Sequence, residues 1–309
     1  MTVQEIIDRS KRGQVTILDG AMGTEIEKLN VISNQRLWAT DAVIQHPSLI
    51  RDLHEKYLYA GAQIIETATY QANPYILAKE GIDGHQIINQ AVEIAHQAVN
   101  NYISETNSKE YPSIGGSIGP YGCALNNGSE YTGNYSLTYT EYQNYHKAQI
   151  ALLAGKVDFL AIETFPKFEE IQAIIELLEE HFPNEQCWIA LSLNKQGNLN
   201  DGTLLEKVIN YLNQHSSVFA IGANCMDIRI TNNIIKRMRK YTKKPLVVYP
   251  NNGDYYSSKL CKWIPNSTIP PFSELALQWF SSGAQIIGGC CRVTPTNIRQ
   301  FSDAIHKNI

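Results

Sequence analysis

Two adjacent cysteines near the end of the chain have the spacing most indicative of chemistry. Cys290 and Cys291 follow a short apolar run and the pair Gly288-Gly289, and Cys225 ends a similar apolar run far upstream. Neighbouring residues of a strand point to opposite faces, but a sharp turn beginning at the two glycines would aim both thiolates at one point. Together with Cys225, they would form a site of three sulfur ligands with one open position, as in catalytic zinc sites. Such a site suits a soft incoming ligand, above all another thiol.

The other three cysteines, Cys123, Cys187 and Cys261, are expected to be ordinary buried side chains, because free cysteine is among the most buried residue types. A disulfide between the adjacent pair is the alternative to a metal site, and it needs an oxidising compartment. The first residues form no secretory segment but lead into a charged amphipathic stretch. We therefore expect a cytoplasmic protein with reduced thiols.

The composition is that of a globular protein with an ample core. The chain has 309 residues, 43% of them hydrophobic, and a formal net charge of −4. Its pI of about 6.1 gives no electrostatic footprint for nucleic acid or for an anionic membrane. No apolar run approaches the roughly 20 residues that span a bilayer. Because no linker or change in composition marks a boundary, we expect one domain over residues 1–309, with small molecules as partners.

Short apolar strand-like runs alternate with longer helical patterns along the whole chain. The predicted strands are Val15–Ala21, Gln63–Thr69, Ile114–Ile118, Asp158–Thr164, Cys187–Leu193, Val218–Cys225, Leu246–Asn251 and Gln285–Cys290. The predicted helices are Ser48–Ala60, Gln86–Ser104, Thr140–Ala154, Glu169–His181, Leu204–His215, Thr231–Tyr241, Ser273–Ser282 and Thr296–Lys307. Thr231 and Ser273 are predicted N-caps, and glycines 61, 155 and 283 are predicted to end three helices. This order predicts an α/β fold, a (β/α)8 TIM barrel, ahead of a doubly wound sheet.

In such barrels the chemistry lies where strands end and βα loops begin. Polar residues at the predicted strand ends are therefore candidates by position: Asp19, Thr67, Thr69, Glu163, Thr164 and Asn251. A carboxylate that ends an apolar run, as Glu163 does, is costly to bury without a partner. The alternatives are an internal ion pair and a site that holds a cationic group near a metal. Two carboxylates on the same rim as three thiolates favour the second.

At this point the chain resembles the zinc-dependent homocysteine S-methyltransferases almost from end to end. The resemblance rests on Gly288–Cys291, on the strand end before Cys225 and on four further segments: Leu18–Thr24, Glu66–Asn73, Ala161–Pro166 and Val248–Asn251. The segments Gly116–Gly122 and Gly128–Gly133 resemble the branch that uses S-methylmethionine or S-adenosylmethionine more than the betaine-using branch.

The resemblance implies a (β/α)8 barrel and one Zn²⁺ per chain on Cys225, Cys290 and Cys291. It further implies that Asp19 and Glu163 hold the amino group of homocysteine, and we add Thr67 to this subsite from its position. Trp38 falls in the loop that matches the methyl-donor side. One departure is that Met226 and Asp227 follow Cys225, where many relatives have Thr and Pro. This departure affects donor preference more than the metal site.

The implied reaction transfers a methyl group from a sulfonium donor to the zinc-activated thiolate of L-homocysteine and gives methionine. No protein side chain is assigned as a general base, since metal coordination deprotonates a thiol outright. Betaine as the donor and selenocysteine as the acceptor are alternatives within the same chemistry. An alternative of another class is a non-enzymatic zinc-binding or thiol-redox protein, which needs neither Asp19 nor Glu163.

Overall fold

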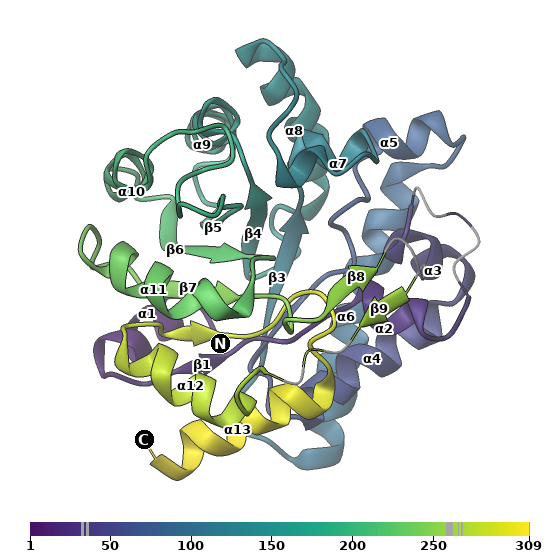
Figure 1. The fold of residues 1–309 in the computed structure, drawn as a ribbon. Coiled ribbons are helices and arrows are strands. Elements are labelled where there is room, and N and C mark those ends of the chain that lie inside the picture. The colour runs from purple at the N-terminus through teal and green to yellow at the C-terminus, as the bar shows by residue number, and fades with distance from the viewer. Residues whose placement is uncertain (32–33, 35–36, 258–261, 265, 267, 309) are drawn as a thin grey trace.

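The computed structural model describes residues 1–31, 34, 37–257, 262–264, 266 and 268–308. Its centre is a sheet of eight parallel strands in the order β1-β10-β7-β6-β5-β4-β3-β2 (Figure 1). The strands are β1 (Thr16–Ile17), β2 (Ile64–Glu66), β3 (Ser113–Ile118), β4 (Phe159–Phe165), β5 (Cys187–Leu191), β6 (Val218–Asn224), β7 (Leu246–Tyr249) and β10 (Ile286–Ile287). All eight fall within the predicted runs or extend them by one residue.

The sheet closes on itself, because its two outer strands also meet. Leu18 forms a parallel bridge with Ile64, the Asp19 N–H donates to the carbonyl of Ile64 at 3.0 Å, and the Gln63 N–H donates to the carbonyl of Ile17 at 2.7 Å. Closure removes both open edges of the sheet. The prediction of a (β/α)8 barrel is confirmed, and the open doubly wound sheet is excluded.

The long helices surround the strands (Figure 1). One follows each strand of the barrel: α4 (Pro47–Tyr59), α6 (Gly84–Thr106), α8 (Tyr139–Leu153), α9 (Phe168–His181), α10 (Leu205–Asn213), α11 (Ile228–Arg239), α12 (Phe272–Ser281) and α13 (Pro295–Asn308). In the part of the chain that the structure describes, none of the helices has the length and apolar character needed to cross a membrane.

Smaller elements, which the sequence patterns do not reveal, precede the first strand or lie in the βα loops. They are α1 (Val3–Lys11), α2 (Gly23–Glu27), α3 (Ala39–Gln45), α5 (Pro74–Lys79), α7 (Tyr121–Ala124), the 3₁₀ turn η1 (Ser129–Tyr131) and a hairpin of β8 (Tyr255–Ser257) and β9 (Lys262–Ile264). Most of them stand at the carboxyl ends of the strands, which is the end that carries function in this architecture.

The core has two parts, one between the strands and the helices and one inside the barrel. Phe159 and Trp188 pack inside the barrel with ring centroids 4.6 Å apart, and Ile64 belongs to the same cluster. Ile6 of α1 joins this cluster, so α1 covers the amino-terminal end of the barrel. Among the described residues, the interior is therefore packed below the rim, and the pocket opens at the carboxyl ends of the strands.

Two of the predicted helix starts are wrong by a few residues. The N-cap of α11 is Asp227, whose carboxylate accepts from the N–H of Arg229 at 2.9 Å, and Thr231 lies inside the helix. The N-cap of α12 is Pro271, and Ser273 is likewise inside. Several residues near a helix start are good capping types, so the pattern alone does not select one. The predicted stops are confirmed, since glycines 61, 155 and 283 have φ of +100°, +70° and +110°.

Candidate metal centre

The three predicted ligand cysteines meet at the rim of the barrel. Cys225 directly follows β6, Cys290 and Cys291 follow β10, and their Sγ atoms all lie within 4.8 Å of one another. The Sγ atoms of Cys225 and Cys291 are 3.8 Å apart. Tetrahedral zinc with Zn–S bonds of about 2.3 Å places its sulfur ligands about 3.8 Å apart. The cluster therefore fits Zn²⁺ with one position left for a further ligand.

Backbone contacts with the end of β7 hold two of these cysteines in place. The Cys225 N–H donates to the carbonyl of Tyr249 at 3.1 Å. The side chain of Asn251 then joins both cysteines, because its Nδ2 donates to the carbonyl of Cys225 at 3.2 Å and its Oδ1 accepts from the Cys291 N–H at 3.1 Å. Cys225 itself has a φ of +49°, a left-handed conformation that is uncommon outside glycine and occurs often at functional sites.

Asn251 is thus predicted to govern how tightly the metal is held. Asn251→Ala removes both bridging hydrogen bonds, and we expect zinc affinity to fall by about tenfold, the lower end of the effect typical for residues that support metal ligands. Competition with a chromogenic chelator measures this affinity. The matched control is Asn252→Ala, whose lost side-chain bond goes to the N–H of Asp254 and not to a cysteine. Equal affinity in the two variants would contradict the bridging role.

Gly288 and Gly289 are needed because neighbouring atoms lie too close to leave room for a Cβ, and not because their backbone conformation is unusual. A Cβ on Gly288 would lie 2.7 Å from the carbonyl oxygen of Asp19, and a Cβ on Gly289 would lie 2.1 Å from the Val293 side chain. The left-handed residue of this segment is Arg292, with a φ of +65°. The turn that contains the two cysteines spans residues 290–293, where the Val293 N–H donates to the carbonyl of Cys290 at 3.0 Å, so it lies slightly later in the chain than predicted.

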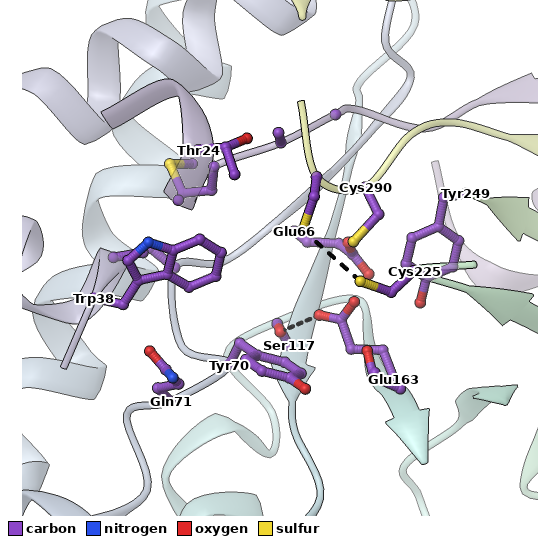
Figure 2. Close-up of a pocket in the computed structure, with 18 of the residues that line it drawn as sticks. Thr24, Trp38, Glu66, Tyr70, Gln71, Ser117, Glu163, Cys225, Tyr249 and Cys290 are labelled. Atoms are coloured by element: carbon purple, nitrogen blue, oxygen red, sulfur yellow. Dashed lines mark hydrogen bonds between the residues drawn. The ribbon is translucent and has the colours of Figure 1, made fainter. Parts of the chain in front are cut away.

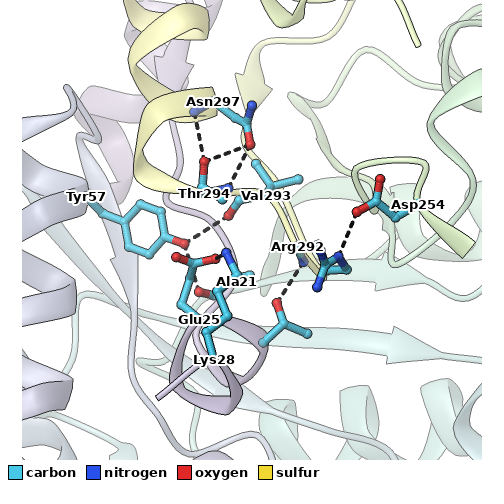
Figure 3. Close-up of polar contacts among 10 residues, drawn as sticks. Ala21, Glu25, Lys28, Tyr57, Asp254, Arg292, Val293, Thr294 and Asn297 are labelled. Carbon is cyan, nitrogen blue, oxygen red and sulfur yellow. Dashed lines mark hydrogen bonds and ion pairs between the residues drawn. The ribbon is translucent and has the colours of Figure 1, made fainter. Parts of the chain in front are cut away.

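Hydrogen bonds from one side chain join the loop after β10 to the loop after β1 (Figure 3). The Tyr57 hydroxyl lies 2.8 Å from the carbonyl of Ala21 and 2.9 Å from that of Val293, so one buried side chain joins both loops. On the other side, Arg292 Nε donates to Asp254 Oδ2 at 2.8 Å. These contacts fix the segment that carries the two adjacent cysteines.

The metal-free cluster favours a single thiolate. Hydrogen bonds from Cys290 and Cys291 lower the pKa of Cys225 well below its ordinary value. The pKa values of Cys290 and Cys291 are raised, because the same sulfur atoms share protons with Cys225. The Cys225 Sγ also contacts the Tyr131 hydroxyl at 3.6 Å, and this contact further lowers the pKa of Cys225. A divalent cation would displace these protons, because thiolates are its ligands.

The cysteines open into a pocket of about 770 Å³, counting the open space at its mouth. Figure 2 shows Glu66, Glu163 and Tyr249 around Cys225 and Cys290. Small and aromatic side chains also line the pocket: Ala21, Thr24, Trp38, Ala39, Tyr70 and Tyr131. None of the described residues lining it is Lys, Arg or His, so its charged side chains are acidic. An acidic pocket next to thiols suits a ligand that carries a cationic group.

The two predicted carboxylates lie in this pocket and are buried, with Asp19 3% and Glu163 8% exposed. The Ser117 hydroxyl donates to Glu163 Oε1, and Asn224 Nδ2 donates to Oε2 at 3.3 Å. Burial raises the pKa of Glu163 to about 7, and burial followed by the charge of Glu163 raises that of Asp19. Neither carboxylate has an internal ion pair in the described structure. The electrostatics therefore favour a bound cation over a structural salt bridge.

Of the remaining predicted residues, Thr67, Thr164 and Trp38 line the pocket, whereas Thr69 and Asn251 do not. Thr67 is buried, and its hydroxyl is already engaged, accepting from the Ser117 N–H at 3.1 Å and contacting Thr69 Oγ1 at 2.6 Å. Trp38 lines the pocket with its ring, and its Nε1 donates to Glu27 Oε1 at 2.7 Å. Their roles toward ligands stay predictions.

Of the other cysteines, Cys123 and Cys187 are 3% and 0% exposed, which confirms their expected burial. Cys261 lies outside the described residues.

Sequence reasoning did not single out several of the pocket residues, among them Glu66, Ser117 and Tyr131. The sequence prediction chose Thr67, the neighbour of Glu66. Because side chains alternate along a strand, Glu66, two residues after the inward-facing Ile64, is the one expected to face the barrel axis. Ser117 lies inside β3, two residues after Gly115, and alternation identifies it only once the inward face of that strand is known. Tyr131 lies in η1, within a long loop whose course no periodic pattern predicts.

Comparison with known proteins agrees with this geometry. A sequence model of the family described as "Homocysteine S-methyltransferase" matches residues 16–305. The homocysteine S-methyltransferase of Escherichia coli is 37% identical, over 92% of this chain and 93% of its own. The crystal structure of the homocysteine methyltransferase MmuM from Escherichia coli in its metallated form has a TM-score of 0.85 at 35% identity, with coverage of 94% and 96%. A selenocysteine methyltransferase of Astragalus bisulcatus is 34% identical, with coverage of 93% and 91%.

Proposed function

Because this chain belongs to the homocysteine S-methyltransferase family, we propose that it transfers a methyl group from a sulfonium donor to the sulfur of L-homocysteine, giving methionine. The donor we propose is S-methylmethionine, with S-adenosylmethionine as the second choice. The observation that carries the proposal is the convergence of three cysteine thiols with buried carboxylates in one pocket. The thiols suit a metal that binds a substrate sulfur, and the carboxylates suit the ammonium end of the same substrate.

We propose Zn²⁺ as the cofactor, held by Cys225, Cys290 and Cys291. When bound, it would supply an open position at which a thiol loses its proton, and so provide the nucleophile at neutral pH. A free thiol with a pKa of about 8.5 is only a few per cent ionised at pH 7. Complete ionisation therefore raises the thiolate fraction roughly thirtyfold. A less basic sulfur is also a weaker nucleophile, and this loss offsets much of the increase. Positioning must supply the larger part of the acceleration.

The carboxylates do the positioning in this proposal. Asp19 and Glu163 accept hydrogen bonds from the α-ammonium group of homocysteine, so that its side chain extends toward the cysteines. Glu163 is suited to this role because Ser117 and Asn224 orient its carboxylate. Alignment of a nucleophile with the reacting carbon contributes several kcal/mol in well-oriented systems. Thr67 helps to shape this subsite.

The transfer itself needs no general base. A lone pair of the homocysteine thiolate forms the new S–CH₃ bond, and the electron pair of the breaking S–CH₃ bond stays on the donor sulfur. The positive charge of the sulfonium and the negative charge of the thiolate disappear together. An acidic, partly enclosed pocket favours approach of a cationic donor. We place the donor on the side of Trp38, where aromatic rings contribute cation–π attraction.

The first experiment measures zinc and activity on the same protein. We expect about one zinc per chain and methionine formation from homocysteine with S-methylmethionine, less with S-adenosylmethionine and none with betaine. A strong chelator is expected to abolish activity, and added Zn²⁺ to restore it. Bound zinc without methionine from any donor would show that the proposed substrates are wrong. Activity that persists in metal-free protein would remove zinc from the proposal.

Selenocysteine is a second candidate acceptor, because a selenocysteine methyltransferase is among the similar proteins. Selenocysteine is shorter than homocysteine by one methylene, so its selenium reaches less far from the ammonium subsite. Competition between the two acceptors for one donor measures the preference. We expect homocysteine to be preferred, and the proposed cytoplasmic location keeps either acceptor in its reduced form.

A further inference from the structure

Glu66 is a third carboxyl group in the pocket, beyond Asp19 and Glu163. It ends β2, two residues after Ile64, which packs inside the barrel, so by strand alternation Glu66 also faces the barrel axis. Its N–H donates to Asp19 Oδ2 at 3.0 Å, which places the two residues directly against each other. Glu66 lines the same pocket as Glu163, Cys225 and Cys290 (Figure 2).

The Glu66 carboxyl group has an acceptor atom that nothing in the described structure satisfies. Its Oε1 is enclosed and has no hydrogen-bond partner, whereas both oxygens of Glu163 have one. An unsatisfied buried acceptor costs about 1–3 kcal/mol, so such atoms usually await a water molecule or a ligand. Tyr249, a residue only 1% exposed, lines the same pocket beside Glu163. The floor of the pocket is therefore incomplete without a bound polar group.

The charge around Glu66 determines the kind of group that fits. No described residue that lines the pocket is Lys, Arg or His. Burial, followed by the charges of Glu163 and Asp19, raises the pKa of Glu66 well above its ordinary value. Three carboxyl groups this close cannot all ionise in a dry pocket unless a cation binds among them. An ammonium group meets this need, because its three N–H donors match three separate acceptors.

We propose that Glu66 is a third acceptor for the α-ammonium group of the amino-acid substrate and, with Asp19 and Glu163, makes that group a strict requirement for binding. This inference rests on the proposed function, since it assigns a residue to the homocysteine subsite. A thiol of the same length without the amino group would leave three acidic side chains without a cation. The enzyme should therefore reject it more strongly than two carboxylates alone would.

Isothermal titration calorimetry of the zinc-loaded protein tests this with two ligands, L-homocysteine and 4-mercaptobutanoate, which lacks the amino group. In the Glu66→Gln variant we expect homocysteine to bind about ten- to hundredfold more weakly, the range for a hydrogen bond to a charged group. Binding of 4-mercaptobutanoate should change by less than about threefold. The ratio of the affinity for homocysteine to the affinity for 4-mercaptobutanoate should therefore fall. A merely structural role of Glu66 would weaken both ligands and leave this ratio unchanged. Zinc content and thermal stability are measured on each sample.

Two further variants keep the test interpretable. Glu25→Gln is the matched control, because Glu25 pairs with Lys28 on α2 and does not line the pocket, and both affinities should stay unchanged. Glu66→Asp keeps the charge but withdraws it by one methylene, and it should fall between Gln and the native residue.

Equal weakening of both ligands by Glu66→Gln, or no weakening of either, would overturn the inference. Failure of the native protein to bind homocysteine at all would instead count against the proposed function.

Discussion

Cys290→Ala is expected to remove the metal and the methyl transfer together. The three Sγ atoms lie within 4.8 Å of one another, at the spacing of ligands to one ion. The variant keeps two thiols, which do not complete a zinc site that already has an open position. We expect zinc affinity to fall by at least about a hundredfold, beyond the ten- to hundredfold effect of residues that only support the ligands. Metal content after dialysis and methionine formation are the two measurements.

The fold should survive this change, because the cysteine side chain is not what holds the segment. The Cys290 N–H donates to the carbonyl of Pro250 at 2.8 Å, and the Val293 N–H donates to the carbonyl of Cys290 at 3.0 Å. Both bonds belong to the backbone and remain in the alanine variant. We therefore expect a cooperative thermal transition like that of the metal-free native protein.

Cys187→Ala is the matched control for cysteine loss. Cys187 is a fully buried residue of β5 and does not belong to the cluster. The Cys187→Ala variant should have a lower free energy of unfolding, because the substitution leaves a small cavity, but it should still bind about one zinc per chain. A Cys290→Ala protein that is free of metal and still active would refute the mechanism. One that retains zinc with native affinity would show that Cys290 is not a ligand.

The sequence was sufficient to predict the cluster of three cysteines because topology determines where strand ends meet. Cys225 and the pair Cys290-Cys291 end strands that lie far apart in sequence, and in a closed parallel barrel all such ends share one rim. The same reasoning brought Asp19 and Glu163 to the pocket. These predictions needed only the order of elements and not the exact register of any strand.

The missed residues depend on details that the order of elements does not contain. Glu66 and Thr67 are neighbours at a strand end, and only the register of β2 decides that Glu66 faces the axis, while the Thr67 hydroxyl bonds to Ser117 and Thr69. Tyr131 reaches Cys225 from a loop in which no periodicity predicts direction. Part of what fixes that loop is Glu170, a buried carboxylate of α9.

Glu170 illustrates why buried acidic residues are ambiguous in sequence. It accepts from the Tyr121 N–H at 2.6 Å and from the Tyr135 hydroxyl at 2.5 Å, and it pairs with His146 at 2.9 Å. Every partner is part of the protein, so this carboxylate serves structure. Glu163, in contrast, faces an open pocket. In the sequence, Glu163 and Glu170 are both carboxylates next to apolar residues. Only their partners in the folded structure distinguish the ligand-facing carboxylate from the structural one.

Glu163→Gln is expected to separate the binding of metal from the binding of homocysteine. Glutamine keeps an oxygen for the Ser117 hydroxyl but loses the negative charge and the acceptor of the long 3.3 Å bond from Asn224 Nδ2. Zinc should remain at about one per chain, since no ligand is changed. Affinity for homocysteine should fall by about ten- to hundredfold, as expected for a lost hydrogen bond between charged groups. Calorimetry and metal analysis on one sample measure both quantities.

The same substitution should raise the stability of the metal-free protein at pH 8. The pKa of Glu163 is raised from 4.5 to about 7 in the folded state, chiefly by burial. A carboxyl group with a raised pKa favours folding while it is protonated, and this contribution is lost as the pH rises from about 4.5 through 7. At pH 8 its ionisation costs the empty protein on the order of 1–3 kcal/mol. Glutamine removes that cost, so the melting temperature should rise by a few degrees.

Whether Glu163→Gln raises or lowers the melting temperature distinguishes a ligand-binding role of this carboxylate from a structural one. The gain in melting temperature should shrink as the pH falls and approach zero below about pH 4, where Glu163 is largely protonated in both folded and unfolded chains. Glu170→Gln provides the contrast, because it breaks bonds within the protein and should lower the melting temperature. A Glu163→Gln variant that is destabilised at pH 8, like Glu170→Gln, would mean that Glu163 is also a structural group. Stability gained while homocysteine affinity is lost is what a residue kept for its ligand predicts.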